Sequence, residues 1–337
     1  MTATRYEGNK KISVVEGCKK APKANEVTVE IAYSGICGTD LHIFHGVMDE
    51  RVGKPHIMGH ECSGVIEAVG SDVSGLSIGD KVVVRPLDPC GACYACQHGM
   101  SHICYNLNFM GVDTDGSMQS YWTVPASTIH KIPQDMDLKN AALVEPVAVA
   151  VHDVNRSGLK AGDKAVVIGG GPIGILVALV AKSFGADVVI SEINPFRLGF
   201  AKDLGIDTVN PTEKDLVTYV NTWTDGVGAD VCFEVSGSKP GAMVMTEVVK
   251  TRGKVVLVGI YGQPAEVNLK QMWLREVELI GARVYEDIDY DLAIDLVAKN
   301  DYSFDKLITK VAPLEELQDI LDGMDTDQQG MKVLVKC

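Results

Sequence analysis

Four cysteines lie close together in this chain, at positions that suit a tetrahedral metal site. They are Cys90, Cys93, Cys96 and Cys104, separated by two, two and seven residues. Zinc prefers thiolate ligands, and four protein ligands close the coordination sphere of a structural site. A redox pair or a disulfide knot is the alternative, but nothing secretory precedes the cluster, and a C-x-x-C pair would not need two further cysteines. We therefore predict a structural zinc site without a position for substrate.

A glycine-rich motif predicts a dinucleotide site. An apolar strand that ends at Ile168 is followed by Gly169, Gly171, Pro172, Ile173 and Gly174, and then by an apolar helix from Ile175 to Phe184. The first glycine permits the turn, the second lets the backbone approach a pyrophosphate at the helix N-terminus, and the third lets the helix pack closely on the strand. A lone G-x-G-x-x-G motif is weak evidence for a dinucleotide site, because an ordinary glycine-rich turn can have the same pattern. Here the motif has the required strand before it and the required helix after it.

A carboxylate about twenty residues further on favours NAD over NADP. The next strand ends in Ser191 and Glu192, where a carboxylate would accept hydrogen bonds from the ribose hydroxyls and repel a 2′-phosphate. A solvated charge at a strand end is the simpler explanation of Glu192 taken alone. Arg197 follows shortly after and could stack on an adenine or bind a phosphate.

A sparser set of side chains offers the mixed ligands of a second metal site. Cys37, His60, Glu61 and Glu145 together supply sulfur, nitrogen and oxygen, as in a catalytic zinc site with an open position. Any one alone would be unremarkable, since single cysteines and histidines are often core residues. Glu145 is the most informative, because it stands in the apolar segment 141–151 and has to be paired, coordinated or protonated if that segment is buried.

Two different patterns of apolar and turn-forming residues surround these candidate site residues. Residues 27–124 contain short β-branched runs interrupted by glycine and proline, which is typical of an irregular β domain. After Val147, apolar strands alternate with helical stretches, which indicates a parallel sheet covered on both faces. We predict a catalytic domain over 1–148 with a zinc lobe at 88–106, a dinucleotide-binding domain over 149–283, and a return of 284–337 to the first domain, with a helix near 290–299 and a strand near 333–335.

Composition excludes several classes of partner. The chain has 337 residues and a formal net charge of −14, which argues against nucleic-acid and anionic-membrane surfaces because both need clustered Lys and Arg. The first eleven residues lack an apolar signal region, and no run approaches the length of a membrane span. The remaining cysteines are scattered singly, as suits a reducing compartment. We expect a cytoplasmic protein with a small-molecule substrate.

These motifs resemble the medium-chain zinc-dependent alcohol dehydrogenase family over essentially the whole chain. The segment 59–64, with Gly70 and Val73 after it, is similar to the family's zinc signature, and the segment 35–40 is similar to its first-ligand loop. The segment 144–146 resembles the polyol (sorbitol) dehydrogenase branch, which has threonine and butanediol dehydrogenases as neighbours. The resemblance implies an α/β protein with a GroES-like irregular β catalytic domain and a doubly wound Rossmann domain, two zinc ions per chain, NAD, and a homotetramer or homodimer.

The resemblance also implies roles for single residues. Cys37 and His60 are direct ligands, Glu61 and Glu145 complete the sphere directly or through water, and Asp40 orients the ring of His60. Spacing alone equally allows Asp40 to be a helix cap. Thr39 accepts the alcohol proton and His42 passes it to solvent, and for His42 the alternative is a surface histidine. By proximity and analogy, the side chains that could line a substrate pocket are those of Phe44, His45 and Tyr121.

The activity implied is oxidation of a secondary alcohol of a small polyol or sugar alcohol by NAD to a ketone, in a reversible reaction. The alternatives are an L-threonine 3-dehydrogenase, a 2,3-butanediol dehydrogenase and, from a different class, a non-catalytic protein that binds zinc and NAD.

Overall fold

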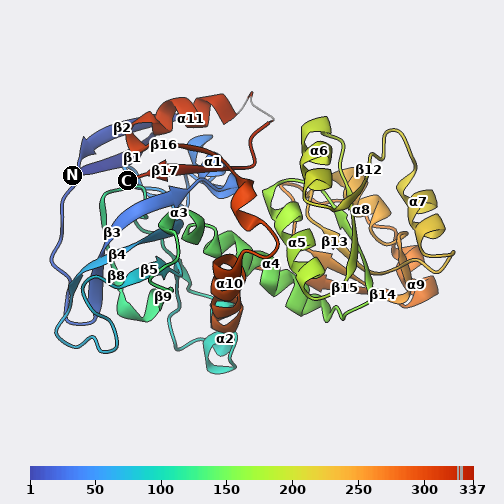
Figure 1. Ribbon diagram of the computed structural model, residues 1–337, viewed down its shortest axis with the longest axis horizontal. Coiled ribbons are helices and arrows are strands. Elements are labelled where there is room, and N and C mark those ends of the chain that lie inside the picture. The colour runs from blue at the N-terminus through green and yellow to red at the C-terminus, as the bar shows by residue number, and fades with distance from the viewer. Residues whose placement is uncertain (325, 327–328) are drawn as a thin grey trace. The chain divides into compact units, whose positions relative to one another are not determined.

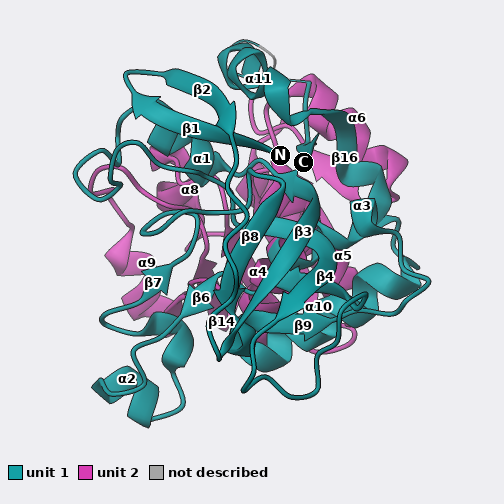
Figure 2. Ribbon diagram, turned by 90° about the vertical axis from the view of Figure 1, so that its left-hand side faces the viewer, with its two compact units in different colours: residues 1–145, 286–337 teal, residues 146–285 magenta. Residues whose placement is uncertain are grey.

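The computed structural model describes residues 1–324, 326 and 329–337. It divides into two compact units, one formed by residues 1–145 and 286–337 and the other by residues 146–285 (Figure 2). The chain therefore leaves the first unit once and returns to it. Among the described residues, the helices are too short or too polar to cross a membrane.

The unit of residues 146–285 is built on a parallel sheet. Its strands, in spatial order, are β12 (Asp207–Val209), β11 (Asp187–Ser191), β10 (Lys164–Ile168), β13 (Ala229–Glu234), β14 (Val249–Leu257) and β15 (Glu278–Gly281) (Figure 1). Five helices alternate with these strands along the chain: α5 (Pro172–Ser183), α6 (Pro195–Asp203), α7 (Leu216–Trp223), α8 (Lys239–Val244) and α9 (Leu269–Arg275). The strand order reverses between β10 and β13, so a crevice for a ligand is expected outside their carboxyl ends.

Burial explains why these strands are apolar on both faces. Val166, Val189, Cys232 and Val255 occupy paired positions on neighbouring strands, and all four are fully buried in one cluster. The strands that end at Ile168 and Ser191, and the helix after β10, lie where the apolar runs predicted them. The prediction of a doubly wound α/β fold beside an irregular β domain is confirmed.

The other unit contains a largely antiparallel sheet. Its strands follow the order β16 (Ile308–Pro313), β17 (Lys332–Lys336), β3 (Glu26–Gly35), β4 (Glu61–Val69), β5 (Lys81–Val84) and β9 (Ile129–Lys131), and β8 (Tyr121–Pro125) also pairs with β3. Two small two-stranded sheets accompany it, β1 (Thr2–Gly8) with β2 (Lys11–Glu16), and β6 (Leu87–Asp88) with β7 (Asn108–Phe109). The C-terminal strand β17 thus lies directly beside β3.

Short helices connect these strands. They are α1 (Gly38–Phe44), α2 (Tyr94–Gln97), α3 (Leu138–Ala141), α10 (Asp287–Lys299) and α11 (Leu317–Met324), with 3₁₀ turns at Ser101–Ile103, Ala126–Thr128, Phe304–Leu307 and Leu314–Glu316. Helix α4 (Val144–Ser157) contains the boundary between the units. The boundaries at 145/146 and 285/286 lie a few residues from those expected from the sequence.

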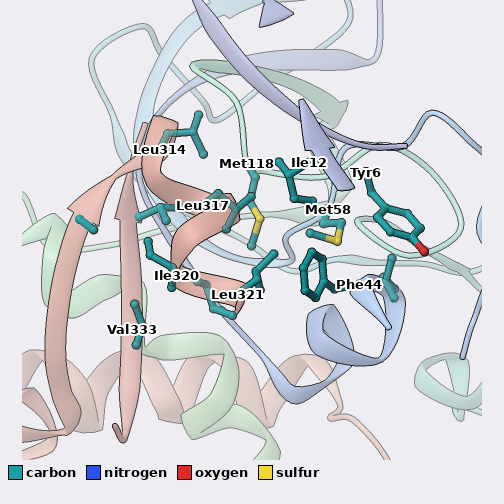
Figure 3. Packing of buried hydrophobic residues seen from close by; sticks show 14 of the residues in the cluster. Tyr6, Ile12, Phe44, Met58, Met118, Leu314, Leu317, Ile320, Leu321 and Val333 are labelled. Atoms are coloured by element: carbon teal, nitrogen blue, oxygen red, sulfur yellow. The ribbon is translucent and has the colours of Figure 1, made fainter. Parts of the chain in front are cut away.

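An apolar cluster joins the two ends of the chain. Tyr6 and Ile12 from the first hairpin pack with Leu317, Ile320 and Leu321 of α11 (Figure 3). Phe44 belongs to the same cluster and is fully buried, so it is a core residue and not a wall of an open pocket. The cluster fixes the C-terminal end of α1, the helix that directly follows Cys37.

Candidate functional site

The cysteine lobe brings four sulfur atoms together. The Sγ atoms of Cys90, Cys93, Cys96 and Cys104 all lie within 4.8 Å of one another. Three of the separations are 3.5 Å (Cys93 to Cys96), 3.7 Å (Cys93 to Cys104) and 3.4 Å (Cys90 to Cys104). Zn–S bonds of about 2.3 Å in a tetrahedron require S···S distances of about 3.8 Å. The four thiols therefore fit a closed zinc site.

Backbone N–H groups donate hydrogen bonds to sulfur atoms of this lobe and favour the thiolate form of Cys90. The amides of Cys90 and Asn106 each donate to Cys104 Sγ at 3.3 Å. Hydrogen bonds from the amides of Ala92 and Cys93 lower the pKa of Cys90 to about 6. Since metals bind thiolates, these donors prepare the lobe for an ion.

Strand pairing brings Cys37 and His60 together. Gly35, at the end of β3, pairs with Glu61, at the start of β4. Cys37 follows as the N-cap of α1, and His60 directly precedes β4. Cys37 and His60 therefore meet at one end of the antiparallel pair of β3 and β4.

The resulting cluster has the donor atoms of a zinc site. One ligand atom each of Cys37, His60 and Glu61 lies within 4.8 Å of the others, and His60 and Glu61 are buried. Glu145, in the first turn of α4, is also buried but is not part of that close group. Its charge contributes to raising the pKa of His60, so it lies within electrostatic range. Sulfur, nitrogen and oxygen donors that converge in this way fit a catalytic zinc ion.

Asp40 contacts both ligand segments. Its Oδ2 accepts a hydrogen bond of 2.8 Å from the Cys37 amide, which makes it part of a capping box on α1. Its Oδ1 lies 3.8 Å from His60 Nδ1, which is an electrostatic contact beyond hydrogen-bond distance. Burial alone would lower the pKa of His60, but Asp40 and Cys37 outweigh it and raise that pKa well above its ordinary value. Asp40 is therefore a cap that also faces the histidine.

Lys332 is a site residue that the sequence reasoning missed. Its Nζ, on β17, donates to Glu61 Oε1 at 2.7 Å, to Glu61 Oε2 at 2.6 Å and to the Ile36 carbonyl at 3.2 Å. Both side chains of the ion pair are almost fully buried. The signal was present, because Lys332 stands in the apolar run 331–335 and needs a partner there for the reason given for Glu145.

Thr39 and His42 lie on α1, directly after Cys37. They are three residues apart, so they share one face of that helix. Thr39 is half-buried and His42 is exposed. This placement suits a path from the metal ligands toward water, and their role as a relay stays a prediction.

The glycine motif has the geometry that a dinucleotide needs. Gly169 has a φ of +103°, and Gly171 is the N-cap of α5, which begins at Pro172 and Ile173. A Cβ atom on Gly174 would lie 1.9 Å from the Gly169 carbonyl oxygen, so only glycine fits there. The free N–H groups at the start of α5 are suited to a pyrophosphate.

Glu192 already has backbone partners. Its Oε2 accepts from the Gly170 amide at 2.7 Å, and its Oε1 accepts from the amides of Ile193 at 2.7 Å and Asn194 at 2.8 Å. Arg197 Nη1 lies 3.8 Å from Oε2. The carboxylate therefore ties the glycine loop to the end of β11, in addition to the ribose contact expected of it.

Two family models match the chain. The model described as alcohol dehydrogenase GroES-like domain matches residues 23–134, and the one described as zinc-binding dehydrogenase matches residues 172–299. Together the two models cover most of the chain. They include most residues of the candidate metal site and the dinucleotide site, but Glu145, Gly169, Gly171 and Lys332 lie outside the matched ranges.

Individual proteins are similar over nearly the whole length. A 2-dehydro-3-deoxy-L-galactonate 5-dehydrogenase of Pseudoalteromonas atlantica is 53% identical, over 100% of this chain and 99% of its own. A D-arabitol-phosphate dehydrogenase of Enterococcus avium is 33% identical, over 93% of this chain and 90% of its own. Among solved structures, a zinc-binding dehydrogenase of Sinorhizobium meliloti bound to NADP superposes with a TM-score of 0.94 at 30% identity, over 100% of this chain and 99% of that one.

The cysteine lobe predicts a loss of stability on substitution. We expect Cys93→Ser to release one zinc ion per chain and to lower the Tm by roughly 5 °C or more, since 1 kcal/mol is worth about 2 to 4 °C at this size. Activity per folded molecule should change much less. Calorimetry and elemental analysis measure both effects, with Cys18→Ser, an exposed cysteine outside the cluster, as the control. An unchanged Tm after loss of that zinc would refute a structural role.

The Lys332–Glu61 pair predicts that substitution of Lys332 lowers the free energy of unfolding strongly, and that the size of this loss depends on the residue at position 61. In metal-free protein, Lys332→Met leaves a buried carboxylate unpaired and should cost about 3 to 5 kcal/mol of unfolding free energy. Adding Glu61→Gln should restore part of that loss, because the charge is then gone. Denaturant unfolding checks this cycle, with Lys336→Met as the control, since Lys336 is on the same strand and exposed. Purely additive effects of the two substitutions would contradict a direct pair.

Proposed function

Because the chain belongs to the medium-chain zinc-dependent alcohol dehydrogenase family and is an oxidoreductase, we propose that it transfers a hydride from a secondary alcohol of a sugar acid to NAD and forms a ketone. The proposed substrate class thus changes from the small polyol or sugar alcohol expected from the sequence to a sugar acid. The observation that carries the proposal is the close group of Cys37, His60 and Glu61 in a chain that is 53% identical, over its whole length, to a dehydrogenase named for a deoxy sugar acid.

The proposed catalytic site divides its tasks among a few side chains. Cys37 and His60 would hold a zinc ion, and Glu61 and Glu145 would complete or exchange in its coordination sphere. A bound zinc ion supplies Lewis acidity that lowers the pKa of a hydroxyl group, and the nicotinamide accepts a hydride. Lys332 balances the charge of Glu61, and Asp40 faces the ring of His60. Thr39 would accept the hydroxyl proton, and His42 would pass it to water.

We propose NAD as the preferred cofactor and two zinc ions per chain. Glu192 supports NAD because its carboxylate would repel a 2′-phosphate. Arg197 lies close enough to Glu192 to reduce that repulsion, so the preference rests on the balance of the two charges. The four thiols of the cysteine lobe would hold one of these ions, and the group of Cys37, His60 and Glu61 would hold the other.

We also propose a homo-oligomer, as expected from the family. Strand β15 lies at the edge of its sheet, and two copies of one edge strand can pair around a twofold axis. Next to it in the chain, α9 exposes Trp273 and Leu269, and Leu279 on β15 is also exposed. Such a group of apolar side chains beside an open edge fits a second copy of the chain.

Substrate profiling tests the proposed reaction directly. With NAD and nicotinamide absorbance as the readout, we expect kcat/KM for 2-dehydro-3-deoxy-L-galactonate to exceed that for sorbitol, 2,3-butanediol and L-threonine at least ~100-fold. His60→Ala should lower kcat at least ~1,000-fold and leave the Kd for NADH within about twofold, because the glycine motif lies in the other unit. Higher activity on L-threonine would contradict the substrate class, and an active His60→Ala protein would contradict the site.

Cofactor choice should depend on Glu192. Glu192→Ala removes the ribose acceptor and the repulsion of a 2′-phosphate, so the ratio of kcat/KM for NAD to that for NADP should fall roughly tenfold. Both values should decrease somewhat, since the glycine loop loses its tie to β11. Glu213→Ala, at an exposed site, is the control. An unchanged ratio would mean that Glu192 does not set cofactor choice.

The position of β15 at the edge of its sheet predicts that a charge placed on this strand changes the oligomeric state. Leu279→Lys places a charge on β15 and should shift the protein to a smaller species in sedimentation velocity, with unchanged secondary structure. Lys at an exposed position of the loop between α7 and β13, Val227→Lys, is the control. The same sedimentation coefficient for Leu279→Lys and the wild type would place the interface elsewhere.

A further inference from the structure

Glu234 is a fully buried carboxylate that none of the roles above uses. It is the last residue of β13, beside β10 and the glycine turn that follows it. Its Oε1 accepts from the Ser236 amide at 3.1 Å and from the Ser236 hydroxyl, and its Oε2 accepts from the Gly237 amide at 3.2 Å and the Tyr261 hydroxyl at 2.6 Å. Four neutral donors from two different loops thus surround one charge.

These bonds join the loops that follow β13 and β14. The main-chain carbonyl of Glu234 also accepts from the amides of Val258 and Gly259, both at the start of the second loop. The two loops approach so closely that a Cβ on Gly259 would lie 2.4 Å from the Gly237 nitrogen. Burial, followed by the bond to Glu234, raises the pKa of Tyr261, so that its hydroxyl keeps its proton and remains a donor.

The joined loops lie next to the glycine turn. A Cβ on Gly169 would lie 3.0 Å from the Ser236 nitrogen, so the first loop packs directly against the first glycine of the motif. On the second loop, the side chain of Ile260 is 78% exposed, although its neighbours are held in place. An apolar side chain is therefore presented at the carboxyl edge of the sheet, where ligands of this fold bind.

We propose that Glu234 is a positioning residue for the nicotinamide half of the dinucleotide. Glu192 and β11 lie on one side of the strand-order reversal and serve the adenosine half, so the loops after β13 and β14, on the other side, serve the nicotinamide half. Glu234 acts through these loops by fixing Ser236 at the glycine turn and Ile260 as an apolar surface for the ring. This inference rests on the proposed use of a nicotinamide dinucleotide.

Comparison of NADH with ADP tests the proposal, because ADP carries the adenosine and phosphates but no nicotinamide. Titration calorimetry on the full-length protein should show that Tyr261→Phe, which removes one hydrogen bond, raises the Kd for NADH about three- to tenfold and leaves the Kd for ADP within about twofold. Glu234→Gln, which disturbs both loops, should raise the Kd for NADH at least ~tenfold and should also leave the Kd for ADP within about twofold. Tyr219→Phe, a half-buried tyrosine on α7, is the control.

An unchanged Kd for NADH in Tyr261→Phe and Glu234→Gln would overturn the proposal, as would an equal loss of NADH and ADP affinity. Tyr261→Phe keeps the test decisive if Glu234→Gln fails to fold, since it leaves the carboxylate and its three other side-chain contacts in place. A wild-type protein that binds neither NADH nor ADP would instead contradict the proposed function, and the role of Glu234 with it.

Discussion

The buried ion pair between Glu61 and Lys332 is the contact on which the candidate metal site depends. A carboxylate at the first position of β4 is excluded from water, and a lone charge there would cost several kcal/mol. Lys332 compensates for it from β17, a strand that the chain reaches only after passing through the other unit. The same ammonium group bonds the carbonyl of Ile36, the residue before Cys37. One side chain from the C-terminal strand therefore contacts both ligand segments.

The two candidate sites use buried carboxylates in the same way. Glu61 and Asp40 lie at the proposed zinc site, and Glu192 and Glu234 lie behind the proposed dinucleotide loops. Asp40 caps its own helix, whereas Glu61, Glu192 and Glu234 each accept hydrogen bonds from a segment that is distant in sequence or from a different loop. Because an unpaired buried charge is costly, such a carboxylate holds its donors in one arrangement. Flexible loops at the ends of strands thereby become defined enough to orient a ligand.

Local patterns in the sequence predicted the elements and the motifs well. The glycine fingerprint, the four cysteines and the apolar strands are short-range signals, and each reflects a requirement of its own backbone or metal geometry. The tertiary partners of buried charges were not predictable in this way. Lys332 and Glu234 each stand within an apolar run, which signals a buried charge. Only the pairing of β17 with β3 and of β3 with β4 shows that Lys332 meets Glu61, and only the pairing of β13 with β14 shows that Glu234 meets the loop that contains Tyr261. Phe44 was misjudged because proximity to Cys37 in sequence does not reveal on which side of α1 a residue packs.

We propose that Cys37, His60 and Glu61 hold a metal ion on which turnover depends, while the cysteine lobe holds a second ion that serves only the fold. Stepwise removal of metal by a chelator, with zinc content and activity followed together, tests this assignment most directly. We expect two zinc ions per chain at the start, and complete loss of activity when the ion held by Cys37, His60 and Glu61 is released while the lobe still holds its own. Full activity in protein that retains only the lobe zinc would contradict it.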